Sequence, residues 1–128
     1  GTTDNAGQCF AGMAKRATGK ALTVVLNSED RFLDTRLLMD YYFANYAVLR
    51  VDLPQTDQNR YLDEEGQWRE FRLERPYAAL IKPWQAGSAR VYRRIDDLSA
   101  NPDLSTPIGA LEITLDGQFL AEVPLYAR

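Results

Sequence analysis

The first third of the chain holds two short runs of small and apolar residues that predict a β-hairpin. The runs span residues 8–16 and 20–26 and are separated by Ala17-Thr18-Gly19, which suits a three-residue hairpin loop. Both faces of the first strand carry small or apolar side chains. We therefore expect both faces to be covered, as in the central strand of a layered sheet.

A helix is predicted next, over residues 29–46. Apolar side chains recur at helical spacing from Phe32 to Tyr46 and form a broad stripe, which is typical of a helix packed on a sheet. Ser28 is the expected N-cap, because its hydroxyl can accept a hydrogen bond from a free amide of the first turn.

Beyond residue 46 the pattern contains no second helix and predicts short strands separated by turn residues. Asp116-Gly117 lies between two such runs and predicts a tight hairpin, because both residues tolerate a positive φ. Many short strands with intervening turns are typical of a small β-sandwich. The predicted strands span residues 46–53, 68–74, 77–82, 90–95, 108–115 and 119–126.

Composition places a domain boundary near Ala47. All 6 prolines follow residue 50. Residues 1–47 carry five basic and five acidic side chains, whereas residues 48–128 carry ten and thirteen. We therefore predict an α+β fold in which a strand hairpin with a helix, residues 1–47, precedes an all-β domain, residues 48–128.

Composition and charge exclude several classes of protein. The chain has 128 residues, 45% of them hydrophobic, and a formal charge of −3, which gives no general attraction to nucleic acid. It contains no run of about 18 apolar residues and no visible signal peptide. The absence of histidine excludes Ser-His-Asp and Cys-His catalysis and His-ligated metals, and the single cysteine excludes an internal disulfide. We expect no metal and no cofactor.

The opening residues carry the most specific motif. They read Gly1-Thr2-Thr3-Asp4-Asn5-Ala6-Gly7-Gln8-Cys9-Phe10. This stretch resembles the segment that begins at the glycine of the Lys-Thr-Gly box in serine-type D-Ala-D-Ala carboxypeptidases, the low-molecular-mass penicillin-binding proteins. In that family an aromatic, His or Thr residue follows the glycine, then Thr, two variable residues, Ala-Gly, one variable residue and often Cys-Leu. The matching positions are Gly1, Thr3, Ala6, Gly7 and Cys9, and Phe10 replaces the usual leucine.

The resemblance covers residues 1–47 well and residues 107–126 moderately. The predicted hairpin and helix resemble the family's next two strands and final helix, and residues 108–125 resemble the closing hairpin of its C-terminal β domain. Residues 48–106 are similar only in being β-rich. The implied fold is the C-terminal strands and helix of a penicillin-binding/β-lactamase-like catalytic domain, followed by a small all-β sandwich.

The resemblance implies a hydrolase that removes the terminal D-alanine from peptidoglycan stem peptides through an acyl-enzyme and that β-lactams inhibit. The family's nucleophile and base lie in a Ser-x-x-Lys motif, and no serine of this sequence has a lysine three residues later. Ser99-Ala100-Asn101 spells the family's Ser-x-Asn element, but it follows the Lys-Thr-Gly region instead of preceding it, so we interpret it as coincidence. We expect the 128 residues to be inactive without an N-terminal catalytic segment.

The resemblance assigns Gly1, Thr2 and Thr3 to the substrate site. It implies that the backbone N–H of Thr2 is one donor of the oxyanion hole, that Gly1 leaves room for the substrate backbone, and that Thr3 supports the strand. The alternative interpretation is that Gly1 is an ordinary turn glycine or a tag remnant.

Residues 48–128 carry no catalytic constellation and support a second hypothesis. They would form a non-catalytic spacer or interaction module of a cell-envelope protein. We interpret four other features as structural rather than functional. Asp63-Glu64-Glu65 is expected to be a solvated turn rather than a cation site, and Cys9 a buried structural thiol. Arg90, Arg93 and Arg94 are expected to be surface arginines rather than a site for anionic wall polymer, and Trp68 and Trp84 to be packing residues.

The expected location follows from the resemblance alone. Members of the family are exported and act in peptidoglycan biosynthesis and cell shape, so we expect a periplasmic or extracellular protein associated with the cell envelope. Membrane contact is expected only through an anchor outside these residues, and no nucleic-acid partner is expected.

Overall fold

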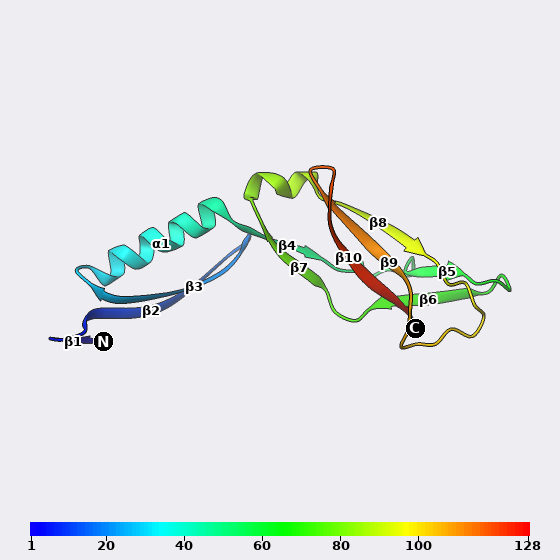
Figure 1. Cartoon of the computed structure of the whole chain (residues 1–128), viewed down its shortest axis with the longest axis horizontal. Helices are drawn as coiled ribbons and strands as arrows, with labels where there is room; N and C mark the ends of the chain where they lie inside the picture. Colours follow the sequence, from blue (N-terminus) through cyan, green and yellow to red (C-terminus); the bar gives the residue numbers. More distant parts are fainter. The chain divides into compact units, whose positions relative to one another are not determined.

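The computed structural model describes all 128 residues and is built mainly of β-strands (Figure 1). The chain divides into two compact units. Unit 1 comprises Gly1–Val48 and Leu80–Trp84, and unit 2 comprises Leu49–Ala79 and Gln85–Arg128. The assignment of residues 1–47 to a catalytic domain stays a prediction. No helix is long and apolar enough to cross a lipid bilayer.

Unit 1 contains a three-stranded antiparallel sheet and one helix. β1 (Thr2–Thr3), β2 (Gly7–Arg16) and β3 (Gly19–Ser28) are hydrogen-bonded in that order, and α1 (Arg31–Asn45) follows them (Figure 1). The loop between β2 and β3 is shorter than predicted, because Arg16 pairs with Gly19 and leaves only two residues in the turn. Gly19 itself belongs to β3, with a φ of 148° that favours glycine.

The N-cap of α1 is Asp30, not the predicted Ser28. Asp30 has extended backbone angles, and its carboxylate accepts a hydrogen bond from the N–H of Leu33 at 3.1 Å. The hydroxyl of Ser28 instead accepts from the N–H of Asp30 at 3.0 Å and donates to the carboxylate of Asp34. Both residue types are good caps, but the bonds of Ser28 form a turn ahead of the helix, so α1 begins at Arg31.

The helix covers one face of the sheet and leaves the other uncovered. Buried Ala21 and Val25 share the covered face with Phe10, whose ring meets the ring of Phe32 edge-on with 5.2 Å between centroids. Within these 128 residues only one face of β2 is covered, not both as expected. The opposite face, called the open face below, consists of the exposed side chains of Ala11, Met13, Leu22, Val24 and Leu26.

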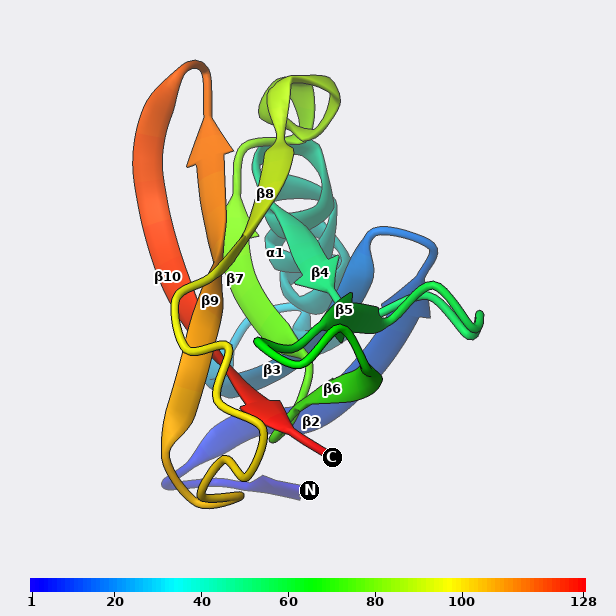
Figure 2. The same cartoon turned by 90° about the vertical axis from the view of Figure 1, so that its right-hand side faces the viewer.

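Unit 2 is built around a five-stranded antiparallel sheet. The elements that follow α1 are β4 (Ala47–Val51), β5 (Arg60–Leu62), β6 (Trp68–Leu73), β7 (Tyr77–Ile81), the 3-10 helix η1 (Pro83–Ser88), β8 (Arg90–Ile95), β9 (Pro107–Leu115) and β10 (Gln118–Ala127). The five strands lie in the order β5, β6, β10, β9, β8, and β4 pairs with β7 separately (Figure 2). Every strand predicted after residue 46 is present, and the one further strand in this part of the chain is the three-residue β5, which was not predicted.

The core of unit 2 collects side chains from the five-stranded sheet and from β4. Ile108, Ile113 and Leu125 are at most 1% exposed, and Val51 of β4 packs in the same cluster. The hairpin at Asp116-Gly117 is confirmed, with φ values of 52° and 77° at its two turn residues.

A close backbone approach fixes the end of β8 against β9. A Cβ at Gly109 would lie 2.0 Å from the carbonyl oxygen of Arg94. Beside it, the N–H groups of Asp96 and Asp97 both donate to the carbonyl of Ile108, at 2.7 and 2.9 Å. The chain can leave β8 this close to β9 only because residue 109 has no side chain.

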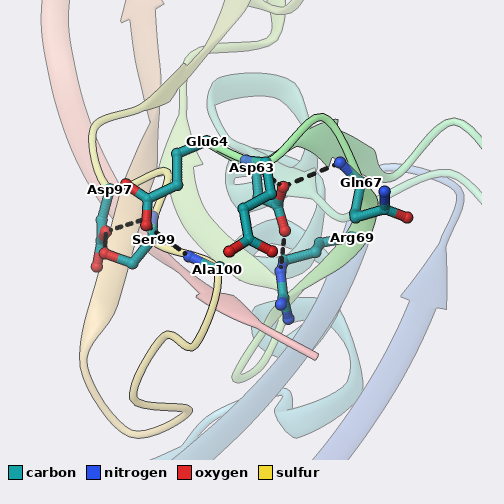
Figure 3. A network of polar contacts seen from close by, with 8 residues as sticks. Asp63, Glu64, Gln67, Arg69, Asp97, Ser99 and Ala100 are labelled. Carbon is teal, nitrogen blue, oxygen red and sulfur yellow. Dashed lines mark hydrogen bonds and ion pairs between the residues drawn. The ribbon is translucent and has the colours of Figure 1, made fainter.

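Asp63 organises the turn between β5 and β6 (Figure 3). Its buried carboxylate accepts the N–H groups of Glu65 and Gln67, each at 2.9 Å, and the Nε–H of Arg69 at 2.7 Å. These hydrogen bonds, that of Gln67 foremost, hold the pKa of Asp63 below its ordinary value. The interpretation of this run as a solvated turn is wrong for Asp63, although Glu64 and Glu65 are exposed.

The same turn holds the segment between β8 and β9. The N–H of Glu64 donates to the carbonyl of Leu98 at 2.7 Å, and the carboxylate of Glu64 accepts from the N–H of Ala100 at 3.2 Å. The hydroxyl of Ser99 donates to the carboxylate of Asp97 (Figure 3). The Ser-x-Asn sequence at residue 99 therefore forms part of a loop of unit 2.

Replacing Gly109 with alanine should destabilise unit 2 by about 1–3 kcal/mol, the usual cost of forcing an atom into packed space. The matched control is Gly87→Ala, because a Cβ at Gly87 meets nothing within 4 Å and its φ is not positive. Urea unfolding followed by circular dichroism compares the two variants. Equal stability of both would contradict the close approach at Gly109.

Asp63→Asn should lower the stability of the protein at pH 7 and reduce the loss of stability that acid causes. The folded pKa of Asp63 lies below the unfolded one, so its contribution is present above about pH 4 and is lost as the pH falls through the folded value. Thermal unfolding at pH 7 and pH 3 measures this. Asp57→Asn, which alters an exposed carboxylate without a hydrogen bond, should leave the profile unchanged. If acid destabilises wild type and Asp63→Asn equally, Asp63 does not hold the turn as described.

Candidate functional site

The three residues assigned to the substrate site lie on an edge strand. Thr2 and Thr3 form β1, which pairs with β2. The N–H of Cys9 donates to the carbonyl of Gly1 at 2.8 Å, and the amino group of Gly1 donates to the carbonyl of Cys9 at 3.1 Å. The chain's opening residues are thus held in the sheet by a reciprocal pair of hydrogen bonds.

This pairing turns the backbone of Thr2 away from β2. Antiparallel strands alternate between residue pairs that exchange two hydrogen bonds and pairs that exchange none. Gly1 and Cys9 exchange both, so the next pair, Thr2 opposite Gln8, exchanges none. The N–H and C=O of Thr2 therefore face the outer edge of the sheet, where Thr2 is exposed.

The turn after β1 explains other positions of the motif. The hydroxyl of Thr3 accepts a hydrogen bond from the N–H of Ala6 at 3.0 Å. Gly7 has a φ of 66°, and a Cβ there would lie 2.4 Å from Oδ1 of Asn27. A Cβ at Gly1, in contrast, meets nothing within 4 Å. Within this chain the conformation and packing favour glycine at Gly7, whereas no residue of the chain requires glycine at Gly1.

Cys9 is half-buried rather than buried as expected. Its Sγ lies 3.6 Å from the carbonyl oxygen of Ala6 and 3.9 Å from that of Gly7, within reach of a weak thiol hydrogen bond. The thiol therefore belongs to the turn that leads from β1 into β2.

Arg31 is a residue of the site that the sequence analysis missed. Its Nη1 donates to the hydroxyl of Thr2 at 2.9 Å and lies 3.5 Å from the carbonyl oxygen of Cys9. Its backbone N–H donates to the side-chain oxygen of Gln8 at 3.3 Å. The start of α1 is thus fastened to β1 and β2. A signal was present, because a basic residue in the first helical turn is unfavourable to the helix dipole and needs a compensating contact.

The arrangement offers a free backbone N–H beside a guanidinium at an exposed sheet edge. Backbone donors fixed in place suit an oxygen that carries or develops negative charge, and a nearby cation strengthens such a bond. No group of three or more Cys, Asp or Glu side chains is placed to hold a metal ion. The chemistry open to this site is therefore anion or oxyanion stabilisation by the backbone of Thr2.

Arg31→Ala should speed hydrogen exchange of the backbone N–H of Cys9 about fivefold. Loss of a hydrogen bond worth about 1 kcal/mol lowers the free energy of the local opening that exposes this N–H by the same amount. Arg36→Ala is the matched control on the same helix, because Arg36 is exposed and makes no ion pair or hydrogen bond. Residue-resolved hydrogen exchange measures both. Unchanged exchange in Arg31→Ala, or the same change in both variants, would show that Arg31 does not secure β1.

No protein-family model matches the sequence. Several solved protein chains have a similar fold, among them the following two. Penicillin-binding protein 5 from Haemophilus influenzae is 16% identical, with a TM-score of 0.68. The D-alanyl-D-alanine carboxypeptidase from Francisella tularensis is 20% identical, with a TM-score of 0.59. Each match covers 99% of this chain but only 39% and 33% of the two known chains. The chain thus has the fold of a segment that makes up roughly a third of each of these proteins.

Proposed function

We propose that the chain is the C-terminal part of a serine-type D-Ala-D-Ala carboxypeptidase that trims the terminal D-alanine from peptidoglycan stem peptides. The observation that carries the proposal is the N–H of Thr2. It faces the outer edge of a sheet in a chain whose fold is similar to that of a penicillin-binding protein and a D-alanyl-D-alanine carboxypeptidase.

In the proposed reaction this chain stabilises charge rather than attacking the substrate. A serine outside these residues adds to the carbonyl of the terminal peptide bond, and a base takes its proton. The carbonyl oxygen becomes an oxyanion, which the N–H of Thr2 binds as one of two donors. The C–N bond then breaks, the amine of D-alanine leaves with the proton, and water hydrolyses the acyl-enzyme. β-Lactams would acylate the same serine.

The open face of unit 1 supports the need for an N-terminal catalytic segment. Met13 and Leu22 are 74% and 72% exposed, and β3 has no strand on its outer edge. A contiguous apolar face of this kind is usually covered in the working protein. We propose that the segment with the serine and its base covers this face and completes the sheet, so the 128 residues alone are inactive.

The proposed activity also determines the partners and the location of the protein. The substrate would be a peptidoglycan stem peptide and β-lactams would be inhibitors, which places the protein in the periplasm or outside the cell, at the envelope. Membrane contact would come only from an anchor outside these residues. We propose no nucleic-acid partner.

A second candidate function applies to unit 2. It folds around a core of its own, centred on Ile113 and Leu125, and the site residues Gly1, Thr2 and Thr3 all belong to unit 1. This favours a spacer or interaction module that accompanies the catalytic part.

Fluorescent penicillin tests the main proposal. A longer protein that joins this chain to a segment with a Ser-x-x-Lys motif should be labelled, because it holds the nucleophile. The 128-residue chain at the same concentration should stay unlabelled. Labelling of the 128 residues alone would contradict the absence of the nucleophile, and a longer protein that resists labelling would contradict the proposed activity.

Thr2→Pro in the longer protein tests the proposed donor, since proline has no N–H. Acylation by penicillin should slow by about 10²–10³-fold, as when one oxyanion donor is removed in other enzymes. Thr2→Val, which keeps the N–H and the shape of the side chain, should lose far less. Similar rates for the two variants would remove Thr2 from the mechanism.

A further inference from the structure

β8 is an edge strand of the five-stranded sheet in unit 2 and is largely exposed. β8 ends the strand order and pairs only with β9, and its first five residues are exposed. Val91 lies opposite the fully buried Ile113, and Arg93 lies opposite the buried Leu111. Val91 and Arg93 therefore share the face of the sheet that carries the core, yet nothing covers them at this edge.

A groove of about 510 Å³ runs beside these two side chains. Phe71 and Leu111 of the core line it together with Val91 and Arg93. Its far wall is formed by residues 51–54 and 58–59. The groove is thus apolar on the core side and lies along an edge whose backbone groups have no strand partner.

Arg93 brings to this groove a positive charge that no carboxylate pairs with. Its guanidinium lies 5.4 Å from the centroid of the Phe71 ring and forms no ion pair with a carboxylate. Arg94, on the opposite face, is instead neutralised by an acidic cluster. Asp52, at the far wall, accepts the N–H of Leu53 and lies 3.8 Å from Arg50. The members of the cluster around Arg94 are Asp96, Glu112 and Glu122.

We propose that β8 receives an extended acidic segment of a partner protein as an added strand, with an apolar side chain against Val91 and a carboxylate, two residues away, on Arg93. Addition of a strand satisfies the free backbone groups of the edge, and alternate side chains give specificity. Side chains two apart on a strand point to the same face, so they match the spacing of Val91 and Arg93.

Charge selects this occupant over a second copy of the chain. Pairing of two β8 strands would bring Arg90 and Arg93 of each copy close to the arginines of the other, and like charges across a strand pair are destabilising. The competing interpretation is that the arginines only protect the edge from aggregation, as charged side chains do on many edge strands.

The test uses the full chain and a seven-residue peptide, Thr-Val-Thr-Glu-Thr-Val-Thr, whose two ends are blocked. Fluorescence anisotropy of the labelled peptide measures binding, and a second peptide has Lys in place of Glu. Arg93→Glu should weaken binding of the Glu peptide by about tenfold or more and strengthen binding of the Lys peptide. Arg90→Glu is the matched control, because Arg90 lies on the opposite face of the same strand, opposite Thr114, and is bonded to the carbonyls of Gly87 and Ala89.

Two further measurements keep the test decisive. Circular dichroism checks that the variants fold, and Arg93→Gln replaces Arg93→Glu if the reversed charge unfolds the chain. In the wild-type chain, the Glu peptide should protect amides of residues 90–95 from hydrogen exchange. Failure of the Glu peptide to bind at about 1 mM, equal binding of both peptides, or equal effects of Arg90→Glu and Arg93→Glu would overturn the proposal and leave edge protection as the role of these arginines.

Discussion

The reciprocal hydrogen bonds between Gly1 and Cys9 are the interaction on which the account of the site depends. They make Gly1 and Cys9 a hydrogen-bonded pair, and strand geometry then requires Thr2 to direct its N–H away from β2. Arg31 secures the same strand through the hydroxyl of Thr2. If the register shifted by one residue, the N–H of Thr2 would point into the sheet and the site would lose its donor.

Local patterns predicted most of the fold, and the differences arise where distant residues decide. The strands and the helix follow from periodicity, but Ser28 and Asp30 are both capable caps, and only the bond from Ser28 to Asp34 settles which one begins α1. The three residues of β5 are too few to show a period. The motif located Thr2. The basic residue Arg31 in the first helical turn indicates locally that a compensating contact is needed, but its partner Thr2 lies far away in the sequence and cannot be identified from a local pattern.

Each of the two units has a sheet edge or face that nothing in this chain covers. In unit 1 the open face, which includes Met13 and Leu22, and the outer edge of β1 are uncovered. In unit 2 the edge at β8 combines free backbone groups with the unpaired charge of Arg93. Sheet edges are usually protected or covered, and for this reason both proposals assign these open surfaces to contact with other polypeptide.

The most direct measurement is a crystal structure of the longer protein acylated by a β-lactam. The account predicts that the carbonyl oxygen of the acyl group lies about 2.7–3.1 Å from the backbone nitrogen of Thr2, the distance of an oxyanion-hole hydrogen bond. An acyl carbonyl held by other donors, with the N–H of Thr2 directed toward β2, would contradict it.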